Sequence, residues 1–307
     1  MPTVEATENT KVLVTGANGF VAMGIIQELL QQGFSVRGSV RSHEKGMQLK
    51  EIFSTYGDKL EYVIVDDILK ARRSAFLAFE GAFDEAVLGV KAVQHTASPV
   101  PGYFPDEDPL EVAHMRPFNG PTVLDENDWG DEYVKIVEER GKEAAIMDKY
   151  SASKTLSERA AWDFYEQHKK GVEWDLVVIS PSHPLNQNFK TADEVTRSVH
   201  YWYEYMFEEQ PAEILKATTT YVDVRDIAAA HVEALKKEAA AGQFFLTHKP
   251  EYFAKGILKA PLPDLKAEVM FTINSRKAQD ILGIKYRSFE ETMLSMLAEF
   301  EKRCFFD

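Results

Sequence analysis

The sequence has one cysteine, Cys304, in 307 residues. A single thiol can form neither an internal disulfide nor a cysteine-rich zinc cluster, so we expect a reducing, cytoplasmic location. The eight histidines lack the paired spacing of metal ligands, and we therefore expect no metal site. These absences exclude disulfide-stabilised secreted domains and favour an intracellular protein.

Basic residues are also scarce, with 35 Lys and Arg against 49 Asp and Glu and a net charge of -14. Such a surface repels phosphate backbones, so we expect no nucleic-acid partner. No apolar run approaches the ~20 residues that a membrane-spanning helix needs, and we expect no membrane partner. The polar, acidic first ten residues are not typical of a signal or transit peptide.

Short apolar runs alternate with amphipathic segments through the first half of the chain. Strands are expected at Lys11–Val14, Ser35–Val40, Leu60–Val65 and Ala92–Ala97, with a helix over Phe20–Gln32 after the first strand. Further elements are a helix after Tyr150, a strand at Trp174–Ile179 and helices at Asp226–Lys237 and Glu290–Arg303. The pattern predicts an α/β fold of the Rossmann type, a doubly wound parallel sheet.

A glycine-containing turn, Thr15-Gly-Ala-Asn-Gly-Phe-Val-Ala22, joins the first strand to the first helix. Gly16 permits a tight turn, and Gly19 allows the backbone to approach a pyrophosphate that binds at the helix N-terminus. An ordinary strand–turn–helix junction is the alternative. The position at the first βα turn favours a dinucleotide, with candidate ligands Thr15, Gly16, Asn18, Gly19, Phe20 and Val21.

The end of the second strand carries arginines where NAD-binding proteins have an acid. Arg37 and Arg41 could pair with a ribose 2′-phosphate, which favours NADP over NAD, although both could be solvated surface residues. Asp66 and Asp67 follow the third strand, where they would lie beside the adenine or cap the next helix.

Tyr150 and Lys154 are four residues apart, which places them on one face of a helix. A nearby ammonium stabilises a phenolate, so Lys154 is expected to lower the pKa of Tyr150. The Lys could also hydrogen-bond a ribose. A Tyr–Lys pair at this spacing usually lies on a solvated helix face. Because the same sequence also carries the glycine turn, a catalytic role is favoured here.

With both motifs, the chain resembles the extended short-chain dehydrogenase/reductase family, in the branch of dihydroflavonol, cinnamoyl-CoA and fungal carbonyl reductases. Matching segments are Val12–Ala22, Val36–Arg41, Ala82–Val87, His95–Val100, Tyr150–Lys154, Tyr221–Ile227 and Ile281–Ser288. The resemblance implies that Tyr150 donates a proton to a carbonyl oxygen while NADPH delivers hydride to the carbon. It also implies that Lys154 holds the nicotinamide ribose and that Ala97 and Ser98 line the cofactor cleft.

The family's third catalytic group is a Ser or Thr at the end of the strand before the Tyr helix. Residues 98–149 should supply a crossover helix and that strand, but prolines interrupt the first half of this segment. We therefore expect one central strand to be missing, lost between about Glu111 and Thr122, with Thr122 or Ser98 as speculative substitutes.

The sequence thus predicts an NADPH-dependent oxidoreductase that reduces a small aldehyde or ketone, acting as a monomer or homodimer. A dinucleotide-binding core is expected over 1–180 and 216–248, with a smaller substrate-binding part over 181–215 and 249–307. The alternatives are a catalytically impaired, truncated NADP-binding homologue and an epimerase or dehydratase of sugar nucleotides.

Overall fold

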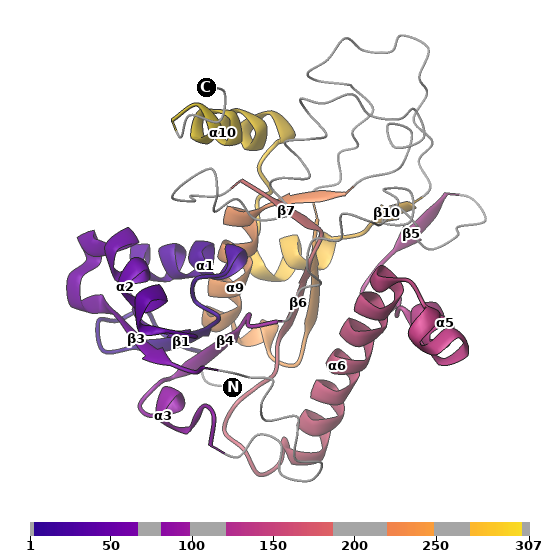
Figure 1. Ribbon diagram of the computed structural model, residues 1–307, viewed down its shortest axis with the longest axis horizontal. Coiled ribbons are helices and arrows are strands. Elements are labelled where there is room, and N and C mark those ends of the chain that lie inside the picture. Colours follow the sequence, from indigo (N-terminus) through magenta and orange to yellow (C-terminus); the bar gives the residue numbers. More distant parts are fainter. Residues whose placement is uncertain (1–2, 67–80, 99–120, 187–219, 249–270, 303–307) are drawn as a thin grey trace. The chain divides into compact units, whose positions relative to one another are not determined.

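The computed structural model describes residues 3–66, 81–98, 121–186, 220–248 and 271–302 (Figure 1). The chain divides into two compact units. One comprises Pro2–Pro99 and Val224–Ala240, and the other comprises Val100–Asp223 and Ala241–Asp307 together with Met1. This division by contacts does not coincide with the expected division by function, which stays a prediction. None of the helices in the described ranges is long and apolar enough to span a membrane.

The unit that contains the glycine turn has a four-stranded parallel sheet in the order β3-β2-β1-β4. Its strands are β1 (Lys11–Thr15), β2 (Ser35–Val40), β3 (Leu60–Ile64) and β4 (Ala92–His95). The helices are α1 (Phe20–Gln31), α2 (His43–Ile52), α3 (Asp84–Val87) and α9 (Val224–Lys236). The strand order 3-2-1-4 is that of a Rossmann fold and confirms the predicted fold class.

The core of this unit explains why α1 forms where the sequence predicts it. Ile25, Ile26, Leu29 and Leu30 recur at helical spacing, and all are buried. The same apolar cluster includes Ala228 of α9. Helix α9 approaches α1 closely because α1 carries Gly24, where a side chain would lie 3.3 Å from Val224 Cγ2 and 3.8 Å from Ala228 Cβ.

A half-buried histidine, His231, joins α9 to the sheet. His231 Nδ1 lies 2.7 Å from Gln94 Oε1, and the Gln94 Nε2 group donates to the His231 backbone oxygen at 3.1 Å. Burial lowers the pKa of His231 to about 4, so the ring is neutral at physiological pH. In this state Nδ1–H can donate to Gln94, and the pair fixes α9 against β4.

This histidine predicts a pH-dependent stability. Its pKa is about 6.5 in the unfolded chain and about 4 in the folded chain, so the unfolded state takes up the proton first as pH falls. We expect its contribution, on the order of 3 kcal/mol, to be complete above pH ~7 and lost between pH ~6.5 and ~4. Urea denaturation from pH 7 to pH 4.5 should show a shallower loss of stability for His231→Gln than for the wild type. Replacement of exposed His168 by Gln is the control, and equal pH slopes for His231→Gln and wild type would refute the prediction.

The second unit contains helices α5 (Asp131–Arg140), α6 (Ile146–His168) and α10 (Phe289–Lys302). Its strands form three parallel pairs, β6–β9, β7–β8 and β10–β5. Their bounds are Thr122–Leu124 for β5, Val178–Pro181 for β6, His183–Leu185 for β7, Tyr221–Asp223 for β8, Phe244–Thr247 for β9 and Phe271–Ile273 for β10. Helix α10 is attached to β8 because Thr292 Oγ1 donates to buried Asp223 at 3.0 Å.

The strand pairing agrees with the loss of a central strand. Within the described ranges, β4 pairs only with β1, β6 pairs only with β9, and no strand is paired with both β4 and β6. Thr122, considered as a substitute for the missing hydroxyl, instead begins β5 and pairs with Phe271 of β10. A parallel sheet that loses an interior strand is expected to divide at that position, because each interior strand supplies the hydrogen bonds of two neighbours.

Candidate functional site

The turn after β1 is fixed by hydrogen bonds between the carboxyl ends of β1 and β4. Thr15 Oγ1 accepts from the backbone N–H groups of Thr96 and Ala97, each at 3.1 Å, and lies 3.0 Å from His95 Nδ1. Thr96 Oγ1 donates to the Thr15 backbone oxygen at 2.6 Å. Buried Thr15 therefore holds the segment Thr96–Ala97 against the turn, and Ala97 is placed beside Gly16.

The two glycines of the turn are required by its geometry. Gly16 has φ +63, and a Cβ there would lie 3.0 Å from Ala97 Cα. A Cβ on Gly19 would lie 3.0 Å from the Gly16 backbone oxygen. Gly19 is also the N-cap of α1, with no capping side chain and no acidic residue in the first turn. The helix N-terminus thus offers N–H groups and a partial positive charge to an anion, which fits the pyrophosphate of a dinucleotide.

One contributor to this turn was not predicted. Ser39 on β2 accepts a hydrogen bond from Gly16 N–H through Oγ at 3.2 Å and from Ala17 N–H through its backbone oxygen at 2.9 Å. It is 23 residues from Gly16 in the sequence. Only the β1–β2 pairing brings it to the turn, and no local pattern could have indicated this role.

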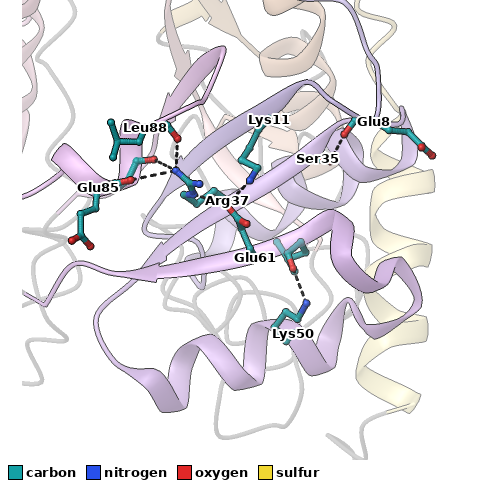
Figure 2. Close-up of polar contacts among 10 residues, drawn as sticks. Glu8, Lys11, Ser35, Arg37, Lys50, Glu61, Glu85 and Leu88 are labelled. Carbon is teal, nitrogen blue, oxygen red and sulfur yellow. Dashed lines mark hydrogen bonds and ion pairs between the residues drawn. The ribbon is translucent and has the colours of Figure 1, made fainter.

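The guanidinium of Arg37 is held by the protein itself (Figure 2). Its Nε donates to Glu61 Oε1 at 2.6 Å, and Nη1 lies 2.9 Å and 2.7 Å from the backbone oxygens of Ala86 and Leu88. Lys11 Nζ shares the same Glu61 oxygen at 2.7 Å. The two cations lower the pKa of the Glu61 carboxyl, and burial opposes them. Arg37 therefore joins β2 and β3 to the C-terminal end of α3, where its charge complements the helix dipole.

The other residues predicted to hold the adenosine part differ in their surroundings. Arg41 is exposed at the carboxyl end of β2, one residue before Ser42, whose Oγ caps α2 by accepting from Lys45 N–H at 3.3 Å. The first turn of α2 carries the acidic Glu44 next to the basic Lys45, so the positive charge of this N-terminus comes from its backbone N–H groups. Asp66 is exposed after β3, Ser98 is half-buried after β4, and Asp67 lies outside the described residues.

Tyr150 and Lys154 lie in the second and third turns of α6, and the Lys154 ammonium is 5.4 Å from the centre of the Tyr150 ring. Burial raises the pKa of Tyr150, and desolvation by the surrounding protein lowers the pKa of Lys154. The expectation that Lys154 lowers the pKa of Tyr150 is wrong for this structure. The shift is caused by burial, which desolvates the phenol and disfavours its charged form.

Contacts along α6 fix the helix that carries this pair. Arg159 Nη1 pairs with Asp131 of α5 at 2.7 Å, and its guanidinium lies 4.8 Å from the centre of the Trp129 ring. At the C-terminal end, Tyr165 donates to Asp175 at 3.2 Å and packs its ring against Trp174. Tyr150 and Lys154 are thus presented by a helix that is attached at two places in its own unit.

A Rossmann sheet, a glycine turn at the first helix N-terminus and a Tyr–Lys pair on a later helix together define the class of nicotinamide-dinucleotide oxidoreductases. No protein-family model matches the chain. A ketoreductase of Aspergillus niger, azaE, is 30% identical over 348 residues, which cover 94% of this chain and 98% of the relative. The NADPH-dependent methylglyoxal reductase GRE2 of Saccharomyces cerevisiae is 26% identical and covers 95% of this chain. The chain belongs to the extended short-chain dehydrogenase/reductase family.

Solved structures show the same fold. Yeast Gre2 in complex with NADPH superposes with a TM-score of 0.76 at 23% identity, covering 96% of this chain and 100% of that chain. Vestitone reductase from alfalfa has a TM-score of 0.68 at 19% identity, covering 96% of this chain and 99% of that chain. The alignment with the Aspergillus relative spans 348 positions although this chain has 307 residues, so the relative contains residues that have no counterpart here. Such unmatched residues are what the internal deletion expected from the sequence predicts.

Proposed function

We propose that Tyr150 is the proton donor and Lys154 the cofactor-positioning residue of an NADPH-dependent reductase. The protein is an oxidoreductase that reduces an aldehyde or ketone of a small organic molecule with NADPH. The observation that carries the residue assignment is the placement of Tyr150 and Lys154 on one face of α6, with the ammonium 5.4 Å from the ring centre. A cytoplasmic location and a monomeric or homodimeric state complete the proposal.

Tyr150 and Lys154 have different roles in the reduction. NADPH, when bound, supplies the hydride that reduces the carbonyl carbon. Tyr150 gives its hydroxyl proton to the carbonyl oxygen, so that the product is an alcohol and a phenolate remains. Because burial raises the pKa of Tyr150, the phenol is protonated before reaction, as a proton donor must be. The Lys154 ammonium, on the same face of α6 as Tyr150, hydrogen-bonds the ribose of the bound cofactor.

The glycine turn and the end of β2 hold the rest of the cofactor. The N-terminus of α1, with Gly16, Asn18, Gly19, Phe20 and Val21, receives the pyrophosphate, and Thr15 and Ala97 form the wall of the turn. Arg41, supported by the N-terminus of α2, takes the 2′-phosphate. Asp66 and Asp67 are assigned to the adenosine part and Ser98 to the nicotinamide side.

The test is oxidation of NADPH, followed by its absorbance, with a panel of small aldehydes and ketones. Consumption of NADPH that depends on the carbonyl compound, with formation of the corresponding alcohol, is expected. Tight NADPH binding without turnover of any carbonyl compound would contradict the proposal and favour a non-catalytic NADP-binding protein.

The two arginines can be separated by mutation. A hydrogen bond to a charged group contributes roughly 1.5–3 kcal/mol, so we expect Arg41→Ala to weaken NADPH binding about 10- to 100-fold and NADH binding little. Arg37→Met should instead lower the melting temperature, because it breaks the bonds to Glu61 and to the end of α3, and should leave the Kd for NADPH nearly unchanged. Equal losses of NADPH affinity in both variants would assign the phosphate to Arg37 as well.

A further inference from the structure

The family resemblance places a hydroxyl beside the substrate carbonyl, on the strand that this sequence is expected to lack. A reductase of this type needs that donor because the carbonyl oxygen gains negative charge as hydride reaches the carbon. The hydroxyls that could replace it include Ser98, Thr122 and one that the sequence analysis did not consider, Ser182 in the chain between β6 and β7.

Ser182 is held in a defined polar environment at the carboxyl ends of β6 and β9. Its backbone N–H donates to the Thr247 oxygen at 3.1 Å, directly after the last paired residues of the two strands. Its Oγ lies 3.1 Å from His248 Nδ1. Ser182 is half-buried, whereas His248 is 1% exposed and its backbone oxygen accepts from Ser275 Oγ at 2.7 Å.

The state of His248 allows it to orient this hydroxyl. Burial lowers the pKa of His248 to about 4, against a smaller opposing effect of the Tyr221 backbone, so the ring is neutral and carries one N–H. With the hydrogen on Nδ1, the imidazole donates to Ser182 Oγ and leaves the hydroxyl hydrogen for another acceptor. A serine that accepts from a fixed imidazole in this way presents its O–H in one direction.

Chain geometry puts Ser182 at the same end of its unit as Tyr150. Tyr165, near the C-terminal end of α6, donates to Asp175, three residues before β6 begins, so this end of the helix is bonded to the chain that leads into the strand. From there Tyr150 lies about 22 Å back along the helix, at ~1.5 Å per residue. Ser182 lies about 23 Å forward along extended chain, at ~3.3 Å per residue. The N-terminus of a helix that precedes a parallel strand faces the carboxyl end of that strand, where ligands of α/β sheets bind.

We propose that Ser182, positioned by His248, donates the hydrogen bond to the substrate carbonyl oxygen that the deleted strand would have supplied. This inference rests on the proposed function, since it assigns a second donor to the carbonyl that Tyr150 protonates. Ser182 is then a catalytic residue and His248 a positioning residue. The reaction is unchanged: the hydroxyl of Ser182 stabilises the developing alkoxide and transfers no proton.

The experiment compares serine and threonine variants of the full chain. Ser182→Ala should lower kcat about 100-fold or more, as loss of one oxyanion donor does, while the Kd for NADPH stays near wild type. The melting temperature should fall moderately, because buried His248 Nδ1 loses its partner. Ser182→Thr should recover a substantial part of the loss because it keeps a hydroxyl. Ser157→Ala, which removes an exposed hydroxyl that donates to the Lys154 backbone oxygen, is the matched control and should leave kcat unchanged.

Variants of His248 test the positioning role. His248→Asn retains an N–H donor near the position of Nδ1 and should retain more activity than His248→Leu, with the difference in kcat and not in KM. If His248→Leu does not fold, the kcat of His248→Asn is compared with that of Ser182→Ala. A positioning role predicts that His248→Asn keeps a higher kcat than Ser182→Ala. Equal kcat values in the two variants would contradict it.

Two outcomes would overturn the inference. One is a kcat for Ser182→Ala within about threefold of wild type while Tyr150→Phe is inactive. The other is a loss confined to Ser98→Ala or Thr122→Val, which would assign the hydroxyl to one of those residues. Failure of the proposed function itself looks different, because Tyr150→Phe would then be as active as wild type.

Discussion

Replacement of Tyr150 by Phe is expected to lower the reductase kcat by about 10²- to 10⁴-fold, the usual contribution of a positioned proton donor. The substitution removes only the hydroxyl and keeps the ring against which the Lys154 ammonium lies. Affinity for NADPH and the melting temperature should therefore change little. Steady-state assays, fluorescence titration with NADPH and thermal melting measure these three quantities.

The control is Tyr62→Phe, which removes a tyrosine hydroxyl bonded to His43 Nδ1 at 2.7 Å in the other compact unit. This variant should retain full activity. If Tyr150→Phe also kept a kcat within about threefold of wild type, another group would have to protonate the product, and α6 would have no part in the chemistry.

Substitution of Gly16 by Ala is expected to abolish tight NADPH binding. The residue has φ +63, which costs an L-amino acid roughly 1–2 kcal/mol, and the new Cβ would lie 3.0 Å from the backbone Cα of Ala97. Ala97 cannot retreat without breaking its hydrogen bond to Thr15 Oγ1. The turn must therefore shift, and the first N–H groups of α1 lose their alignment. We expect at least about a 100-fold increase in the Kd for NADPH, measured by titration calorimetry.

Gly57→Ala separates backbone strain from the steric effect. Gly57 has φ +55, nearly that of Gly16, but a Cβ there would meet nothing within 4 Å. Gly57→Ala should lose stability from its backbone alone, because φ 55 with ψ -124 is a conformation that favours Gly, and only Gly16→Ala should lose the cofactor. A comparable loss of NADPH affinity in Gly57→Ala would show that strain alone weakens binding, and would remove the turn from the explanation.

The strands β1 to β4, the first helix and the Tyr–Lys pair could be predicted because their signals are local. The strand expected at Trp174–Ile179 instead forms at Val178–Pro181, and the other strands of the second unit were not predicted. Strand β2 was expected over Ser35–Val40 and forms there, and α1 was expected over Phe20–Gln32 and ends one residue earlier. Apolar periodicity, a glycine turn and an i, i+4 spacing each depend on residues within a few positions of one another. The sequence also predicts the loss of one central strand, because the order of the family's motifs leaves too little chain between β4 and α6.

The partners of individual polar side chains were decided by the tertiary structure. Arg37 was predicted to bind a phosphate, but its guanidinium is held by Glu61, 24 residues away, and by carbonyls near Leu88, 51 residues away. Ser182 and His248 are 66 residues apart and meet only because β6 pairs with β9. Hydrogen bonds act over about 3 Å, so they are set by which segments pack together.

The sequence by itself therefore determined the class of protein, the cofactor and the Tyr–Lys pair, since these follow from residue types at short spacing. The tertiary structure alone decided that Glu61 holds Arg37, that burial raises the pKa of Tyr150, and that Ser182 meets His248. Charge solvation and hydrogen-bond geometry depend on neighbours that are distant in sequence, and only the packed chain brings those neighbours together.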